Sequence, residues 1–375
     1  MTTPPPATAP ERTLTAARLP ALAVGAQLLG SGGGGEVATG ALLLRRELDR
    51  TPVTLTPAAD LPPDTVVVHV GQGGAPDVLA ERLADPDDFV RAVRTVTDVT
   101  GRPAGAVGVI EVGGLNTLIA GVAAARLGLP LVDGDLMGRA FPRIDQTVAA
   151  LHGLPTHPLA LVGPGGYTVV VRDCAPRRVE PLLRANVLAL GGAAAVALHP
   201  LPAATLARIG VRGSVSACLR LGERFLAATD EHRTTPDDLA AALDAELLAV
   251  GRTEEIVPRQ DLTPGWATLT DRRTGAVVRV DLLDEYLAVT VDGVTRAACP
   301  RIVTAVDPSG RRPLRADQIR TGQHLVLLAL PALYDWPAEA ASLVGPAAFG
   351  LDLTPAPHRT APPGWGRRRT EGGPA

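Results

Sequence analysis

The sequence predicts an α/β protein of two domains, with parallel βαβ units in the N-terminal part and an α+β arrangement after it. A strand, a glycine-rich loop and a helical or turn segment recur three times between residues 65 and 142. Strand signals separated by short turns then dominate residues 265–330. The 375 residues, 46% of them hydrophobic, are enough to form one or two sizeable cores.

The chain before the first repeat predicts two helices around a glycine run. Residues 1–12 are rich in proline and predict a disordered leader. Apolar residues recur at helical spacing over residues 13–29, with Thr13 or Thr15 as the N-cap. The run GSGGGGE follows, and residues 37–48 predict a second helix with basic residues near its end.

The three repeats predict a parallel sheet whose loops meet at one edge. Their strands are expected at residues 65–70, 106–110 and 130–132, and the first two are followed by helices at 76–83 and 116–127. The carboxyl ends of parallel strands share one edge of the sheet, and ligands bind there. We therefore expect three loops to lie close together: Gly71–Gly74, Glu111–Asn116 and Asp133–Arg139.

After Pro158 the pattern changes to an α+β arrangement. A strand is expected at residues 167–172, and helices at 180–190, 205–208, 216–228 and 236–250. Strands are then expected at 266–271, 276–282, 287–291, 301–306 and 324–330. These patterns divide the chain into an N-terminal domain at 13–165, a C-terminal domain at 166–355 and a disordered tail at 356–375.

Composition excludes several classes of function. A net charge of −3 without a basic stripe gives no case for nucleic acid as a partner. The chain contains no lysine, so all 36 basic residues are arginine. This excludes Schiff-base chemistry, a lysine general base and a lysine-dependent phosphate loop. Coding bias explains the missing lysine without any functional adaptation.

Cysteine usage and apolar runs predict a cytoplasmic protein. The three cysteines are widely spaced and odd in number, which argues against a disulfide framework. No signal-peptide pattern is seen, and the longest apolar run, residues 187–198, is too short to cross a bilayer. We expect a small-molecule substrate and no membrane partner, and the oligomeric state stays open, homo-oligomers included.

The glycine run predicts a site built from backbone. Gly30, Gly32 and Gly35 satisfy G-x-G-x-x-G, but a dinucleotide site needs a strand before the loop, and this segment predicts a helix. Consecutive glycines at a helix start instead offer N–H groups to an anion or a polarised carbonyl. The alternative is a flexible surface turn.

Three carboxylates and an arginine follow the predicted strands. Asp133 and Asp135 are two residues apart, so they point to one side if the strand continues. With Glu111 they could form a cluster with one raised pKa, or hold a divalent cation. The alternative for both aspartates is helix capping and loop hydrogen bonding. Arg139 could fix a planar anion or balance the aspartates.

Longer blocks resemble a known family. Residues 109–116 (VIEVGGLN) and 129–142 (LPLVDGDLMGRAFP) resemble the hallmark of the DUF917 proteins, also called the S-methyl-thiohydantoin desulfurase family and often found with hydantoinase/oxoprolinase operons. Residues 29–35, 74–78 with Glu81, and 345–350 are similar to its other blocks. The likeness runs from about residue 14 to 355.

The resemblance implies an N-terminal α/β domain and a C-terminal domain with a swivelling β/β/α-type core. It also implies action on a thiohydantoin-like ring, in which oxygen replaces sulfur and sulfide is released. The chain departs from the family pattern at three places. It has Glu36-Val37 for Asp-Pro, Asp284-Glu285 for Asn-Glu, and Pro300-Arg301 for Pro-Asp.

These observations lead to the hypothesis of a hydrolase-like enzyme acting on a small cyclic amide or thioamide. Glu111, Asp133 and Asp135 would activate water or hold a divalent metal that does so. The groups expected to bind and orient the substrate are Ser31, Gly32, Gly33, Gly34, Gly35, Gly113, Gly114, Asn116 and Arg139. The alternative is a non-catalytic ligand-binding or accessory subunit of a hydantoinase/oxoprolinase-type pathway.

Overall fold

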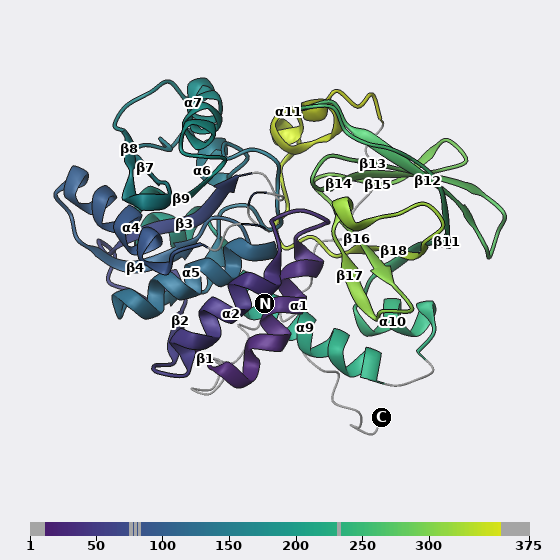
Figure 1. Cartoon of the computed structure of the whole chain (residues 1–375), viewed down its shortest axis with the longest axis horizontal. Coiled ribbons are helices and arrows are strands. Elements are labelled where there is room, and N and C mark those ends of the chain that lie inside the picture. The colour runs from purple at the N-terminus through teal and green to yellow at the C-terminus, as the bar shows by residue number, and fades with distance from the viewer. Residues whose placement is uncertain (1–11, 75–77, 79–80, 82–83, 231–233, 354–375) are drawn as a thin grey trace.

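The computed structural model describes residues 12–74, 78, 81, 84–230 and 234–353. Within them, two large sheets lie side by side, and most helices surround the first sheet (Figure 1). The predicted leader (apart from Arg12), the tail and most of the helix expected at 76–83 lie outside the described residues.

The first sheet has eight strands in the order β1-β2-β5-β4-β3-β9-β7-β8. The pairs β2/β5, β5/β4 and β4/β3 are parallel, which confirms the predicted βαβ units. The remaining pairs are antiparallel. The strand bounds are β1 Thr13–Leu14, β2 Val53–Thr56, β3 Val66–Gly74, β4 Ala104–Val109, β5 Leu131–Val132, β7 Leu159–Val162, β8 Thr168–Val171 and β9 Ala193–Pro202. The sheet thus takes two strands from beyond residue 165.

Helices cover both faces of this sheet because its central strands are apolar on both sides. In β3, Val66, Val68 and Val70 join one core, and Val67 joins the other. On the first face lie α1 (Leu19–Leu29), α2 (Val37–Leu48), α4 (Pro86–Thr100), α5 (Gly114–Leu127) and α9 (Ser214–Asp230). On the second face lie α6 (Val148–Leu151), α7 (Pro176–Ala189) and α8 (Ala203–Ile209).

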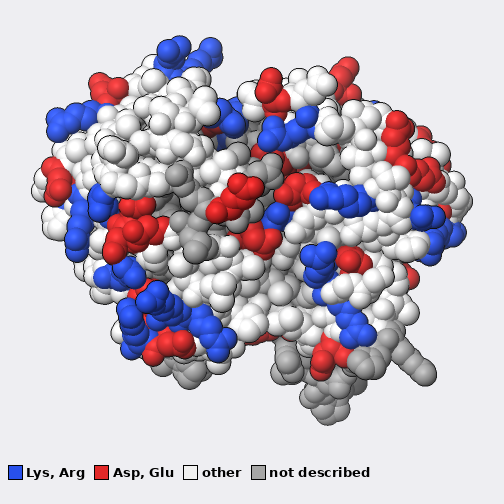
Figure 2. Space-filling model, in the orientation of Figure 1, with Lys and Arg blue, Asp and Glu red and all other residues white. Residues whose placement is uncertain are grey.

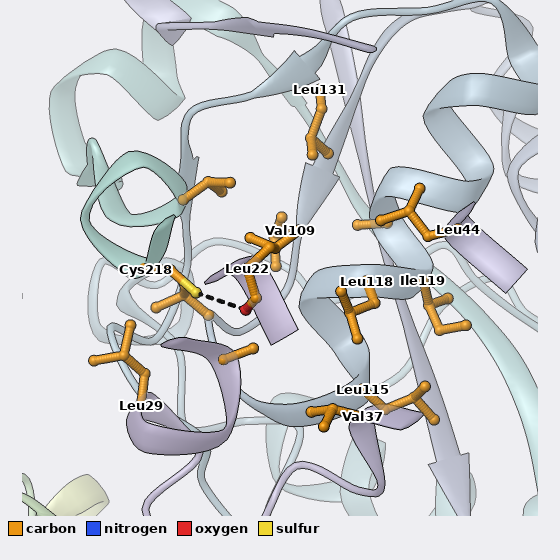
Figure 3. Packing of buried hydrophobic residues seen from close by; sticks show 14 of the residues in the cluster. Leu22, Leu29, Val37, Leu44, Val109, Leu115, Leu118, Ile119, Leu131 and Cys218 are labelled. Carbon is orange, nitrogen blue, oxygen red and sulfur yellow. Dashed lines mark hydrogen bonds between the residues drawn. The ribbon is translucent and has the colours of Figure 1, made fainter. Parts of the chain in front are cut away.

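The core of the first face places α1 and α5 beside the glycine run (Figure 3). Leu22 and Leu29 of α1 belong to this core together with Leu118 of α5, and Cys218 of α9 donates its thiol hydrogen to the Leu22 carbonyl at 3.5 Å. Helices α1 and α9 cross closely at Gly25, where a Cβ would lie 1.9 Å from the Cys218 carbonyl oxygen. This packing fixes the point at which the glycine run leaves α1.

The second sheet is entirely antiparallel, in the order β15-β14-β13-β12-β11-β18-β16-β17. Its strands are β11 Glu246–Val257, β12 Gly265–Asp271, β13 Val277–Leu282, β14 Tyr286–Val291, β15 Val294–Ala298, β16 Ile302–Asp307, β17 Arg312–Leu314 and β18 His324–Leu330. Further elements are α10 (Pro236–Ala242), α11 (Ala341–Val344) and a two-stranded pair of β6 (Gly134–Asp135) with β10 (Val211–Arg212). The described residues also form 3₁₀ helices at Ala16–Arg18, Ala58–Asp60, Pro164–Gly166, Ala316–Gln318, Ala338–Ala340 and Pro346–Phe349. The predicted fold class is confirmed.

Three element predictions are wrong for a tertiary reason. The helix expected over residues 13–29 begins only at Leu19, after Arg18, because Thr13–Leu14 forms β1 and pairs with β2. The expected loop Gly71–Gly74 is the end of β3, paired antiparallel with the alanines that open β9. The expected helix 236–250 ends at Ala242, and β11 begins at Glu246 because it pairs with both β12 and β18. No element was predicted at α4, β7, β9, β15 or β17, although α4 carries the signals of a helix, with Asp85 as its N-cap and Pro86 at its start. Alanine- and glycine-rich strands carry little intrinsic strand signal.

Among the described residues, no helix combines the length and the apolar character needed to span a bilayer.

Candidate functional site

A cavity of about 400 Å³ lies where the carboxyl ends of β3 and β4 face the second sheet. It gathers the end of β3 and the loop after β4, as the sheet-edge argument predicts, and from the third expected loop, residues 133–139, Met137 lines it. The glycine run, which that argument did not include, lies at the same cavity. Figure 2 shows acidic and basic side chains gathered at the junction between the two halves of the molecule. The polar lining includes Gly32, Gly33, Gly34, Gly35, Gln72, Glu111, Asn116, Asp284, Glu285, Arg315 and Asp317.

Glu111 lies in the loop between β4 and α5 and is buried at the cavity wall. Its Oε1 accepts from Asn116 Nδ2 at 2.5 Å, and its Oε2 accepts from the Phe141 N–H at 3.2 Å. Burial raises the pKa of Glu111 to about 7, although these hydrogen bonds oppose the shift. At neutral pH this carboxyl group therefore exists in both protonation states, as a general base or acid requires.

Asn116 fixes Glu111 to the end of β3. While its Nδ2 donates to Glu111, its Oδ1 accepts from the Gln72 N–H at 2.7 Å. A Cβ on Gly71 would lie 3.2 Å from Asn116 Oδ1, so this glycine makes room for the amide. Asn116 lines the cavity as predicted, and its two visible hydrogen bonds make it a residue that orients Glu111.

The glycine run passes between the two sheets. The Gly34 carbonyl accepts from the Leu115 N–H at 2.7 Å, and the Gly32 carbonyl accepts from the Ala316 N–H at 3.0 Å. A Cβ on Gly34 would lie 2.8 Å from the Gly113 carbonyl oxygen, and its φ is +75°, so only glycine fits this crossing. In the described part of the chain, the N–H groups of Gly34 and Gly35 make no hydrogen bond.

Glu285 approaches the cavity from the second sheet, in the turn between β13 and β14. Its side chain lies against Gly33, where an added Cβ would fall 2.1 Å from Glu285 Oε1. The residue is 3% exposed, and Oε2 has no hydrogen-bond partner among the described residues. Burial, with the charges of Asp284 and Glu111, raises the pKa of Glu285 well above its ordinary value. Its surroundings therefore favour the protonated form of the Glu285 carboxyl group.

Sequence reasoning did not assign Glu285 to the site. It noted Asp284-Glu285 only as a departure from a family pattern. The available signal was a pair of acidic residues at a tight turn between two apolar strands. Nothing in the sequence indicated that this turn meets a glycine run more than 250 residues earlier.

The two aspartates predicted beside Glu111 do not line the cavity. Asp133 accepts from the Ser216 N–H at 2.9 Å and from the Ser216 hydroxyl at 2.6 Å, so it caps α9. Asp135 is fully buried, and its Oδ2 accepts from the N–H groups of Val112, Met137 and Gly138. Burial raises the pKa of Asp135 to about 6. The structure thus favours the capping and loop-bonding alternative for both.

The predicted metal set is likewise separated. Across the described ranges, no three His, Cys, Asp or Glu side chains come together as a metal site. Glu111 and Asp135 are neighbours whose charges interact, but Asp133 is turned toward α9.

Arg139 and Ser31 connect the two sheets and do not face the cavity. Arg139 is buried and donates to the carbonyls of Ala140, Arg301 and Tyr286, at 2.8, 2.7 and 3.2 Å. Ser31 Oγ donates to the Val303 carbonyl at 2.6 Å. Neither residue lines the cavity, so the predicted role in orienting a ring does not fit their positions.

Gly113 and Gly114 also serve packing. A Cβ on Gly114 would lie 2.2 Å from the Gly34 carbonyl oxygen. This close approach lets the start of α5 meet the glycine run. The two glycines support the cavity wall from behind, since neither lines it.

Ion pairs occupy the charged groups at the rim. Arg315 joins Glu36, which also caps α2 by accepting from the Ala38 N–H, and pairs with Asp317 at 2.9 Å. Arg259 pairs with Asp284 at 3.1 Å. The family departure at Glu36 thus supplies a contact between the two sheets. The departure at Arg301 supplies an ion pair with Glu246 away from the cavity.

Comparisons with known proteins place the chain by sequence and by fold. Two family models match it: S-Me-THD-like, N-terminal domain, at residues 17–173, and S-Me-THD-like, C-terminal domain, at residues 174–358. A crystal structure of a protein from Chromobacterium violaceum is 23% identical, with a TM-score of 0.73 over 88% of this chain and 93% of that one. No curated protein matches the sequence. Because the two family models cover nearly the whole described chain, the protein belongs to the S-Me-THD-like family.

Proposed function

We propose that the chain hydrolyses a small cyclic amide or thioamide, and specifically that it desulfurises a thiohydantoin-type ring with release of sulfide. One observation carries this proposal. Two buried carboxyl groups with raised pKa values, Glu111 and Glu285, reach a single cavity from different sheets. The two carboxyl groups have different surroundings. In active sites, two titratable groups whose surroundings set different pKa values commonly act as the acid and the base of one reaction. The S-Me-THD-like family match agrees with this substrate class.

Glu111 suits the role of general base. Its pKa of about 7 leaves a large carboxylate fraction at pH 7 to 8, while keeping the group basic enough to take a proton from water. Asn116 holds the carboxylate in place through the 2.5 Å hydrogen bond. The deprotonated water oxygen then bonds to the thiocarbonyl carbon, and the C=S π electrons move to sulfur.

Glu285 suits the role of general acid. Burial raises the pKa of Glu285 well above its ordinary value, which favours the form that carries a proton for sulfur, and its Oε2 has no hydrogen-bond partner among the described residues. The N–H groups of Gly34 and Gly35 are available to the negative charge that builds on sulfur. When the C–S bond breaks, sulfur leaves as HS⁻ with the proton from Glu285. The hydroxyl group of the intermediate gives its proton to Glu285 as its oxygen becomes the ring carbonyl, and the proton held by Glu111 passes to the departing sulfide. One water enters and one hydrogen sulfide leaves.

The test is sulfide release from a thiohydantoin by wild type and by the Glu111→Gln and Glu285→Gln variants. Each variant should lose about 10²- to 10⁴-fold in kcat, because each removes one proton-transfer group. Glu255→Gln, an exposed glutamate on β11, is the matched control and should keep full activity.

Measuring sulfide release also distinguishes the enzyme from the alternative, a non-catalytic accessory subunit. Wild-type protein that binds the corresponding hydantoin, measured by calorimetry, without releasing sulfide from its thio-analogue would refute the enzymatic proposal. Unchanged rates in both glutamine variants would refute the assignment of the two carboxyl groups.

A further inference from the structure

The cavity has an apolar wall beside its polar end. Leu183 and Val187 of α7 line it together with Val196 of β9. All three side chains converge on Gly73, where an added Cβ would meet Val187 at 3.4 Å, Val196 at 3.5 Å and Leu183 at 3.7 Å. These are ordinary van der Waals distances, so the three form one continuous apolar surface next to the β3 backbone.

This wall adjoins the proposed catalytic groups directly. Glu111 is bonded to Asn116, Asn116 accepts from the Gln72 N–H, and Gly73 is the next residue along β3. Alternation along the strand turns the Gly71 and Gly73 positions to the same face. A ring held near Glu111 therefore has the apolar wall within reach of a substituent on that ring.

The two charged residues of α7 that line the cavity, Glu180 and Arg184, already have hydrogen-bond partners in the protein. Glu180 Oε2 accepts from the Ile144 N–H at 2.9 Å, and Glu180 Oε1 accepts from Arg184 Nε at 2.5 Å. Arg184 also donates to the Pro142 carbonyl at 2.9 Å. With these groups satisfied, the inner face of α7 offers a ligand mainly aliphatic surface.

We infer that Leu183, Val187 and Val196 form a subsite for an apolar substituent of the substrate ring, so that the preferred substrates carry an aliphatic or aromatic side chain at the ring carbon nearest β3. The inference rests on the proposed function and adds to it the substrate class. A ring with such a substituent corresponds to a cyclised derivative of a hydrophobic amino acid. An unsubstituted ring leaves the subsite empty and loses the burial of that surface.

The experiment separates binding from turnover. Hydantoin and 5-isobutylhydantoin are titrated by calorimetry into wild type and into Gly73→Ala and Val187→Thr. Burying a four-carbon group should favour the isobutyl ring by about 10- to 100-fold in Kd over hydantoin. Gly73→Ala, whose methyl fills the subsite without a clash, should reduce that preference by about 10-fold and leave hydantoin binding unchanged.

Val187→Thr keeps the shape of the wall and adds a hydroxyl group, so it should also lower the preference. Val294→Thr, at an exposed edge of the second sheet, is the control and should leave the preference as in wild type. Equal affinity of wild type for both rings, or an equal loss for both rings in Gly73→Ala, would overturn the subsite. If the rings bind with the expected preference but no thio-analogue releases sulfide, the enzymatic proposal fails and the subsite stands.

Discussion

Replacing Glu111 with glutamine should change how the stability of the protein depends on pH. The pKa of this buried carboxyl group is raised from an ordinary value of 4.5 to about 7, so the folded state binds its proton more tightly than the unfolded state does. The resulting stabilisation is complete below pH 4.5 and is lost as the pH rises through 7. Above pH 7 the charged group is buried at a net cost.

The magnitude follows from linkage. With these two pKa values, wild type loses about 2.5 kcal/mol of unfolding free energy between pH 5 and pH 8 through Glu111 alone. Glutamine does not titrate, so Glu111→Gln removes this loss. Its amide places a donor against the Phe141 N–H, which costs on the order of 1 kcal/mol at every pH. The difference between the two pH profiles is therefore the quantity to measure.

The assay is urea unfolding followed by circular dichroism at pH 5, 6, 7 and 8, for wild type, Glu111→Gln and the exposed control Glu255→Gln. The free energy difference between Glu111→Gln and wild type should move in favour of the variant by about 2.5 kcal/mol from pH 5 to pH 8. The control should run parallel to wild type. Parallel profiles for Glu111→Gln as well would refute the raised pKa and, with it, the role of Glu111 as general base.

Two further predictions concern residues outside the cavity. Asp133→Ala removes the cap of α9 and should cost about 1 kcal/mol of unfolding free energy in the same assay at pH 7, and an unchanged stability would contradict the capping role. Burial lowers the pKa of His69 to about 4 and that of His199 to about 3, so the unfolded state takes up protons first as the pH falls below 6.5. Each histidine should lower the unfolding free energy by about 2 kcal/mol by pH 5. His69→Asn should remove the part of this loss that is due to His69, which urea unfolding at pH 7 and pH 5 measures.

The sequence correctly predicted which loops meet at the ligand-binding edge of the first sheet. The rule that ligands bind at the carboxyl ends of parallel strands requires only the order and direction of the strands. The apolar strands around Val66–Val70 and Ala106–Val109 were recognisable, and parallel pairing brings their carboxyl ends together. That was enough to place Glu111, Asn116 and the end of β3 at one cavity. It could not show that Gly71–Gly74 continues as strand, because the partner alanines of β9 lie 119 to 123 residues further along the chain and carry weak strand propensity.

The half of the cavity built by the second sheet was beyond sequence reasoning. Contacts between the sheets depend on single long-range bonds, such as the Ser31 carbonyl accepting from the Tyr286 N–H at 2.6 Å. These bonds set Glu285, the residue before Tyr286, against Gly33. No local sequence pattern encodes a contact between residues so far apart in the chain. The position of Glu285 at the cavity therefore could not be predicted.

The positions of Glu111, Asp133 and Asp135 show how backbone N–H donors determine which acidic side chains face a cavity. Glycine-rich loops contain many N–H groups that neither helix nor sheet satisfies, and a nearby carboxylate is their strongest acceptor. Asp135 accepts from three such groups with one oxygen, and Asp133 accepts from the start of α9. Glu111 accepts one N–H and one side-chain amide, so it keeps a face toward the cavity. Of the three predicted acids, Glu111 is thus the one that lines the cavity, and Glu285 joins it there from the second sheet.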